Sequence, residues 1–202
     1  MHSVVCGGNV YTPSKVVCIG RNYVEHIEEL GNEMPESMVL FNKPNSAISH
    51  ELRYVDEQCR FEGELCFLIV GGAIAGVGFG LDLTKADVQN GLKAKGLPWE
   101  RAKAFDGSAV LSRFVPLEVP LKTLKMELWR NGALQQFADY DLMIHKPDAM
   151  LDEISTFMHL EDGDIIMSGT PKGVATYARG DCFVGRIYSG MELLLEAVWS
   201  VP

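Results

Sequence analysis

Three carboxylates in the middle of the chain have the residue types and neighbours of a metal site. Glu62 and Glu64 stand one residue apart in "RFEGELCFLIV", and Asp82 ends the apolar run "VGFGLDL". If the first run is a strand, alternation puts both glutamates on one face, where two bare anions repel each other. Oxygen ligands without a neighbouring histidine or cysteine suit Mg²⁺ or Mn²⁺ better than zinc. The structural alternatives are a solvated strand face for the glutamates and, for Asp82, a favourable charge near a helix N-terminus.

A histidine and a glutamate near the start of the chain have the spacing of an acid–base pair. His26 and Glu29 are three residues apart, so on a helix they share a face and the carboxylate can orient the imidazole. An imidazole made more basic in this way can take a proton from water or from a substrate carbon. An amphipathic surface helix would explain the same pattern without chemistry. Lys103, in "RAKAF", is by itself typical of a solvated surface charge.

Short apolar runs punctuated by glycine predict the strands that must position these residues. Asn131-Gly132 between two such runs predicts a two-residue hairpin, because both residues tolerate the positive φ of a type I′ turn. The glycine-rich "GGAIAGVGFG" lacks the register of a nucleotide-binding loop, so we interpret it as tightly turning strand ends. The β-like runs are "KVVCIG", "MVLFNKP", "LCFLIVGG", "AIAGVGFGLDL", "KMELWRNGALQQF", "DIIMSG" and "MELLLEAVW".

Three segments favour helices. One lies within "TKADVQNGLKAKG", where Thr84 and Asp87 are spaced as a near-capping box, and the others lie within "DAMLDEISTFMHL" and "YVEHIEEL". The last segment carries only Ile27 and Leu30 as obvious inward anchors, so we expect it to close over the site when substrate binds. The pattern as a whole predicts a mixed, β-rich α+β fold with a few short helices.

Length and composition restrict the class of protein. With 202 residues and 47% hydrophobic content, the chain suits one domain over residues 1–202. No apolar stretch approaches the roughly 20 residues that span a bilayer, and the N-terminus lacks a signal-peptide pattern, so we expect a cytoplasmic protein without a membrane partner. The net charge of -9 argues against nucleic acid. The cysteines are scattered without a Cys-x-x-Cys pair, which suggests no structural zinc site.

Several motifs taken together are more specific than any one alone. In order, "CIGRNYVEHIEELG", "FEGELCFLIVGG", "GLDLTKADVQNGLKAKGLPWERAKAFDGSAV" and "DGDIIMSGTPKGV" resemble the fumarylacetoacetate hydrolase family, in its small single-domain branch near the acylpyruvases and oxaloacetate decarboxylases. The resemblance runs from about Lys15 to the C-terminus. It implies a largely β roll that usually forms a homodimer. It also implies that Mg²⁺ or Mn²⁺ binds the Glu-x-Glu plus Asp motif, here Glu62, Glu64 and Asp82.

The resemblance implies roles for further side chains. Lys103 matches a lysine that faces the substrate, where an ammonium can stabilise a developing enolate. His26 and Glu29 resemble the family's catalytic dyad. The positions that match substrate-binding segments of the family are Arg21, Tyr23 and Lys43 near the entrance, Gln89 on the helix after Asp82, and Thr170 in "SGTPKG".

The activity that the resemblance implies first is metal-dependent hydrolysis of a carbon–carbon bond in an acylpyruvate-type 2,4-dioxo acid, of the fumarylpyruvate or acetylpyruvate class. Oxaloacetate decarboxylation would pass through the same enolate. Isomerisation or tautomerisation of an unsaturated 2-oxo dicarboxylic acid needs only proton transfer by the same dyad. Outside enzymology, a 2-oxo acid binding protein without turnover is the alternative. In each case the partner is a small 2-oxo acid.

Overall fold

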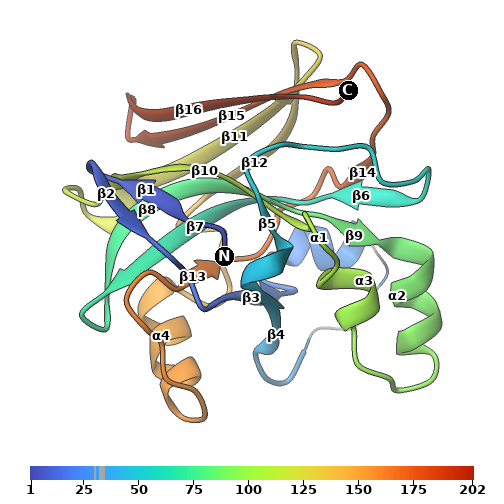
Figure 1. Cartoon of the computed structure of the whole chain (residues 1–202), viewed down its shortest axis with the longest axis horizontal. Helices are drawn as coiled ribbons and strands as arrows, with labels where there is room; N and C mark the ends of the chain where they lie inside the picture. The colour runs from blue at the N-terminus through green and yellow to red at the C-terminus, as the bar shows by residue number, and fades with distance from the viewer. Residues whose placement is uncertain (30, 32–34) are drawn as a thin grey trace.

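The computed structural model describes residues 1–29, 31 and 35–202, and strands dominate it (Figure 1). The α-helices are α1 (Val24–Glu29), α2 (Ala86–Lys93), α3 (Glu100–Lys103) and α4 (Pro147–Ser155). Short 3-10 helices, η1 and η2, span Asn45–Ala47 and Leu121–Thr123. The strands are β1 (Val4–Cys6), β2 (Asn9–Tyr11), β3 (Lys15–Gly20), β4 (Val39–Pro44), β5 (Ile48–Ser49), β6 (Cys59–Phe61), β7 (Gly63–Val70), β8 (Ala73–Asp82), β9 (Thr84–Lys85), β10 (Ala109–Pro116), β11 (Leu124–Arg130), β12 (Ala133–Asp139), β13 (Ile165–Met167), β14 (Ala175–Thr176), β15 (Cys182–Ser189) and β16 (Glu192–Ser200). The mixed, β-rich α+β class is confirmed.

Three sheets organise these strands. The largest has nine strands in the order β2-β1-β10-β8-β7-β13-β3-β4, with β5 paired to β10. A four-stranded sheet, β12-β11-β15-β16, lies above it in the view of Figure 1, and β14-β6-β9 form a small third sheet. In the large sheet β7 is antiparallel to β8 and to β13, and β13 is parallel to β3. Segments far apart in the sequence therefore meet at its centre.

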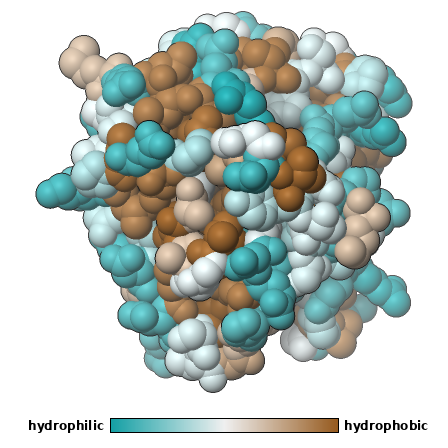
Figure 2. Space-filling view, turned by 60° about the vertical axis from the view of Figure 1, so that its left-hand side comes forward, coloured by the Kyte–Doolittle hydropathy of each residue, from teal (hydrophilic) through white to brown (hydrophobic). Residues whose placement is uncertain are grey.

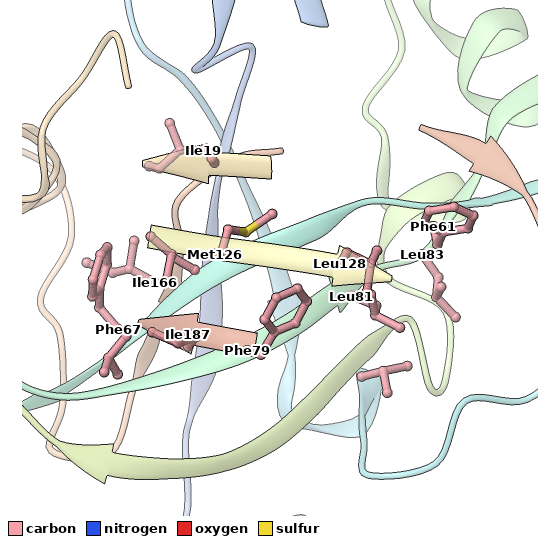
Figure 3. Close-up of a cluster of buried hydrophobic side chains, with 14 of the residues drawn as sticks. Ile19, Phe61, Phe67, Phe79, Leu81, Leu83, Met126, Leu128, Ile166 and Ile187 are labelled. Atoms are coloured by element: carbon pink, nitrogen blue, oxygen red, sulfur yellow. The ribbon is translucent and has the colours of Figure 1, made fainter. Parts of the chain in front are cut away.

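The core lies between the large sheet and the four-stranded sheet. Figure 3 shows Phe79 and Leu81 of β8 beside Met126 and Leu128 of β11, and all four side chains are buried in one cluster. A Cβ on Gly185 of β15 would lie 2.8 Å from the Phe79 ring, so the absence of a side chain there lets the two sheets approach. Truncation of a buried phenylalanine such as Phe79 typically costs about 3–5 kcal/mol.

The predicted strands correspond to β3, β4, β7, β8, β11, β12, β13 and β16. The sequence did not predict β15, where Gly185 interrupts an otherwise alternating pattern. The hairpin is confirmed: Asn131 and Gly132 have φ of 51° and 82° and connect β11 to β12. These positive values are the ones that a type I′ turn requires at its two central residues.

The glycine run was only partly interpreted correctly. Gly71 and Gly72, with φ of 61° and 74°, do form the turn between β7 and β8. Gly80, in contrast, lies inside β8, where a Cβ would be 2.5 Å from the Cys66 sulfur. The interpretation as strand ends is wrong there, because the glycine makes room for a neighbouring side chain within the sheet.

Helices form in all three segments that favoured them, with one correction. Thr84 does not cap α2, since it belongs to β9 and its hydroxyl donates a hydrogen bond to Glu62 instead. The N-cap residue of α2 is Lys85, and its side chain makes no capping hydrogen bond. The short helix α3 was not predicted. In α1, Ile27 is buried as expected, whereas Leu30 lies outside the described residues and the closure of this segment over the site stays a prediction.

The surface carries large hydrophobic side chains as well as charges. Leu134, Phe137, Leu193 and Val198, all on the four-stranded sheet, are exposed. Figure 2 shows hydrophobic residues over a broad part of one face, with hydrophilic residues between and around them. Such exposure is in keeping with a second copy covering part of the surface, but the homodimer stays a prediction. Among the described residues, no helix combines the length and the apolarity that crossing a membrane demands.

Asp164 joins the start of β13 to the start of β3. Its buried carboxylate accepts hydrogen bonds from the backbone N–H groups of Ser14, Lys15 and Glu161, and it pairs with the Lys15 ammonium. Burial alone would raise the pKa of Asp164, but these donors outweigh burial and hold the pKa below its usual value. The ionised form therefore stabilises the fold.

We expect Asp164→Asn to lower the free energy of unfolding by about 2–3 kcal/mol near pH 7. The carboxylate accepts hydrogen bonds from several donors, and the amide that replaces it has a donor group in place of one of the two oxygen acceptors. The folded-state pKa is depressed, so the contribution of Asp164 is present above the ordinary aspartate pKa of about 3.9 and is lost as pH falls through the folded value. Urea unfolding at pH 7 and pH 3 should therefore show the difference between wild type and variant shrinking at the lower pH.

Asp162→Asn is the matched control for this experiment. Asp162 is exposed and accepts one hydrogen bond from the Gly71 N–H, a bond that an amide oxygen also makes. The free energy of unfolding of the Asp162→Asn variant should differ little from that of wild type at either pH. An undiminished loss for Asp164→Asn at pH 3 would show that the ionised carboxylate is not the stabilising form.

Candidate active site

The three carboxylates meet where β7 begins and β8 ends. Glu62 precedes β7, Glu64 is its second residue, and Asp82 is the last residue of β8. One oxygen atom from each lies within 4.8 Å of the other two. The antiparallel register pairs Glu64 with Gly80, and the Asp82 N–H donates to the Glu62 carbonyl at 2.8 Å. The pairing of these strands therefore brings together residues that are about 20 positions apart in the sequence.

Gly63 makes this turn of the chain possible. A Cβ there would lie 2.9 Å from the Gln136 side-chain oxygen and 3.0 Å from Leu128. Instead the Gly63 N–H donates to Gln136 Oε1 at 2.8 Å. The Gln136 amide in turn donates to the hydroxyl of Thr170 and to the carbonyl of Pro171. Gln136 thus fixes the backbone between the two glutamates from the neighbouring sheet.

Sequence reasoning did not single out Gln136. The signal was present, since alternation along β12 places Gln136 inward with Ala138, at a position where a core strand usually carries an apolar side chain. A buried amide there needs hydrogen-bond partners, and the site provides them.

Two lysines partly neutralise the carboxylates. Lys103 Nζ lies 2.6 Å from Asp82 Oδ2 and 2.9 Å from Glu62 Oε2. Lys43 Nζ lies 2.7 Å from the other oxygen of Asp82 and also donates to the Lys103 carbonyl. Burial would lower the pKa of Lys103, but Asp82 and Glu62 outweigh it, so the pKa rises and the ammonium stays charged.

The glutamates differ in their electrostatic environments. Burial, and then the charges of Asp82 and Glu62, raise the pKa of Glu64 well above its usual value, against one hydrogen bond from the Gly169 N–H at 2.7 Å. For Glu62 burial also raises the pKa, but Lys103 and the other donors outweigh it and lower the pKa overall. The arrangement therefore retains an excess of negative potential around Glu64.

The structure brings His26 and Glu29 together on α1. Nδ1 of His26 lies 3.3 Å from Glu29 Oε2, and the Glu29 carboxylate accepts the Gly173 N–H at 3.0 Å. His26 is buried and lines the same cavity as the carboxylates. Glu29 is not among the residues that line this cavity, and it reaches the cavity only through its contact with the imidazole.

The cavity above the carboxylates is narrow, with a volume of about 40 Å³. Arg21 has a φ of 57°, which a residue with a side chain rarely adopts and which points to a functional constraint at this position. The Thr170 hydroxyl donates to the Gly63 carbonyl, so it also holds the turn between the glutamates. The lining residues are Ile19, Gly20, Arg21, His26, Phe41, Glu62, Glu64, Asp82, Gln89, Lys93, Trp99, Lys103 and Thr170.

Two residues expected at the entrance lie elsewhere. Lys43 is fully buried, and its ammonium pairs with the Asp82 carboxylate, so its role in substrate binding stays a prediction. Tyr23 belongs to the main hydrophobic cluster, and its ring is 2% exposed. "GRNY" and "FNKP" do reach the site, but successive side chains point to different sides, so only some of them line the cavity.

The donor set fits a hard divalent cation. It consists of carboxylate oxygens, and burial together with the charges of Asp82 and Glu62 raises the pKa of Glu64, so a cation beside it would be favourable. Oxygen ligands of this kind suit Mg²⁺ or Mn²⁺. Three carboxylates leave coordination positions for a substrate.

Known proteins resemble the chain in sequence and in fold. The model of the fumarylacetoacetate (FAA) hydrolase C-terminal family matches residues 15–194. The oxaloacetate tautomerase of Escherichia coli strain K12 is 40% identical over 191 residues, which cover 85% of this chain and 87% of that protein. The mitochondrial oxaloacetate tautomerase of Homo sapiens is 35% identical over 207 residues, covering 92% and 90%.

A solved structure shows the same likeness. The fumarylpyruvate hydrolase from Pseudomonas aeruginosa, crystallised in complex with Mn²⁺ and pyruvate, is similar with a TM-score of 0.87 at 29% identity, over 99% of this chain and 95% of that one. The human relative is named as mitochondrial, so the cytoplasmic location expected for this chain stays a prediction. The family match extends over most of the sequence and includes every carboxylate of the site. This chain belongs to the fumarylacetoacetate hydrolase family.

Proposed function

We propose that this chain is an oxaloacetate tautomerase, which moves a proton between the methylene carbon of oxaloacetate and the oxygen of the neighbouring keto group. The observation that carries the proposal is the 40% identity, over most of both chains, to an enzyme of that name. From the sequence alone we placed acylpyruvate hydrolysis first and tautomerisation among the alternatives. The relatives reverse that order.

Glu62, Glu64 and Asp82 would hold Mg²⁺ or Mn²⁺ in this proposal. When bound, such an ion supplies a Lewis acid that draws electron density from the 2-oxo group and makes the adjacent methylene protons more acidic. The carboxylates are supported from behind by Lys43 and from the side by the Gly63–Gln136 contact, so the ligand geometry is set before a substrate arrives.

His26 is the residue proposed to move the proton. Its imidazole lines the cavity, and Glu29 lies 3.3 Å from Nδ1, which leaves Nε2 as the nitrogen available to the substrate when Nδ1 carries the hydrogen. Glu29 is itself held by the Gly173 N–H. A base oriented in this way can take a proton from the methylene carbon and deliver it to the keto oxygen, which converts the keto form to the enol.

Lys103 would stabilise the negative charge that develops on the enolate oxygen. Its ammonium stays charged because Asp82 and Glu62 raise its pKa, and it faces the cavity. Gln89 and Arg21 also line the cavity, where they can hydrogen-bond the rest of the substrate. Thr170 is committed to the Gly63 carbonyl through its hydroxyl, so we assign it to holding the turn.

Hydrolysis of a fumarylpyruvate-type acid is the second candidate. The similarity to the fumarylpyruvate hydrolase from Pseudomonas aeruginosa favours it, since that structure shares nearly the whole fold. Hydrolysis needs a water molecule placed by His26, whereas oxaloacetate decarboxylation needs no base at that position. Product analysis separates the three reactions: exchange of the methylene protons, cleavage of an acylpyruvate, and release of pyruvate from oxaloacetate. A binding protein without turnover would show none of them.

The first test of this proposal measures proton exchange. In D₂O with Mn²⁺, wild-type protein should speed deuterium incorporation into the methylene group of oxaloacetate, followed by NMR, faster than pyruvate appears. His26→Ala should slow the catalysed exchange by roughly 10²–10⁴-fold, the usual contribution of a general base. His159→Ala is the matched control, because His159 is exposed and lies outside the site. Exchange no faster than in buffer would reject the tautomerase.

The second test concerns the metal. Glu64→Gln keeps an oxygen for the Gly169 N–H but removes a charge that Asp82 and Glu62 repel. In excess chelator we expect the variant to be at least as stable as wild type. In Mn²⁺ at 100 times its dissociation constant, wild type should gain about 2.7 kcal/mol and the variant almost nothing.

Thermal and urea unfolding with and without Mn²⁺ measure this difference. Glu51→Gln is the control, because Glu51 forms an exposed pair with Arg53 far from the cavity and should leave the Mn²⁺ effect intact. Equal stabilisation of wild type and Glu64→Gln by Mn²⁺ would place the ion elsewhere.

A further inference from the structure

Lys93 is a cation of the cavity that neither the sequence nor the family resemblance singled out. It is the last residue of α2 and follows Gln89 by one helical turn, so both side chains project from one face of the helix. Both line the cavity above the carboxylates. Lys93 is half-buried, which is unusual for a lysine at the end of a helix.

In the part of the chain that the structure describes, no carboxylate lies within ion-pair distance of the Lys93 ammonium, and Glu62 acts on it only from further away. The one recorded contact of the ammonium there is with the face of Trp99, 5.2 Å from the ring centroid. Burial, and then the charges of Arg21 and Lys103, lower its pKa and outweigh the opposing effect of Glu62. A half-buried cation without a counter-ion is costly unless a ligand supplies one.

The other cations of the site are differently placed. Lys103 is held by Glu62 and Asp82, and Lys43 is buried behind Asp82. Trp99 packs against Phe41 with ring centroids 5.9 Å apart, and this aromatic wall supports the stem of Lys93. Lys93 therefore lies on the wall of the cavity beside Trp99 and does not pair with the carboxylates at ion-pair distance.

The two ends of a 2-oxo dicarboxylic acid bind different kinds of cation. Its 2-oxo carboxylate end matches a hard cation held by the acidic cluster, and its second carboxylate needs an organic cation a few ångströms further on. We propose that Lys93 is a specificity-determining residue that binds this second carboxylate, with Arg21 beside it. The inference rests on the proposed function, since it names the class of substrate that the same site prefers.

Ligand binding to the Mn²⁺-loaded protein, measured by calorimetry, tests the inference with a readout other than the rate of catalysis. The probes are oxaloacetate and 2-oxobutyrate, which has a methyl group in place of the second carboxylate. Lys93→Met keeps the length of the side chain and its contact with Trp99 but removes the charge. It should weaken oxaloacetate binding by about 10- to 100-fold, as for loss of a charge-assisted hydrogen bond, and change 2-oxobutyrate binding less than about twofold.

Two further variants complete the design. Lys93→Arg keeps a cation and should retain oxaloacetate binding within about threefold. Lys85→Met is the matched control, because Lys85 also lies over an aromatic ring, 4.8 Å from the Phe105 centroid, but outside the cavity. It should leave both dissociation constants unchanged.

The outcomes separate this inference from the proposed function. Equal weakening of both probes by Lys93→Met would mean that the lysine only supports Trp99, and no weakening of either would mean that it does not meet the ligand. Either result overturns the inference. If wild type prefers oxaloacetate and loses that preference in Lys93→Met, yet shows no proton exchange, the inference stands and the tautomerase proposal fails.

Discussion

Repulsion among three carboxylates, two of them buried and one partly buried, is the constraint on which the arrangement of this site depends. Glu62, Glu64 and Asp82 bring oxygen atoms within 4.8 Å of one another, in a place with little water to screen them. Lys103 and Lys43 reduce the repulsion, and both contact Asp82. The remaining excess falls on the most buried glutamate, whose pKa is raised. A divalent cation would remove that excess, which is why a metal is the partner that the proposed chemistry needs.

Holding like charges together requires a rigid frame, and two sheets supply it. The β7–β8 pairing sets the separation of the carboxylates along the large sheet. The four-stranded sheet reaches across through Gln136, whose side chain fixes Gly63 and Thr170. Packing around Phe79 keeps the two sheets in this relation. The core and the site are therefore coupled, since loosening the contact between sheets would release the turn that carries both glutamates.

Local patterns in the sequence were sufficient for residues whose neighbours lie close along the chain. His26 and Glu29 meet because a helix repeats every 3.6 residues, and the glutamates meet because one residue separates them. The hydrogen-bond partners of Lys43 and Gln136 were beyond such reasoning. Lys43 donates to a carbonyl 60 positions away, and Gln136 accepts from an N–H group 73 positions away. Only the order of strands in the sheets determines those meetings, and periodicity contains no information about it.

The same charges explain why a second carboxylate on the substrate would matter. A divalent cation bound among Glu62, Glu64 and Asp82, together with the two ammonium groups that pair with them, leaves the site with more positive than negative charge. A substrate with one carboxylate would balance this end but leave Lys93 and Arg21 without a counter-ion from the ligand. A dicarboxylate could pair its second carboxylate with Lys93 in the proposed binding mode. Charge complementarity along the length of the ligand, more than the shape of a narrow cavity, is then what separates an oxaloacetate-like substrate from other 2-oxo acids.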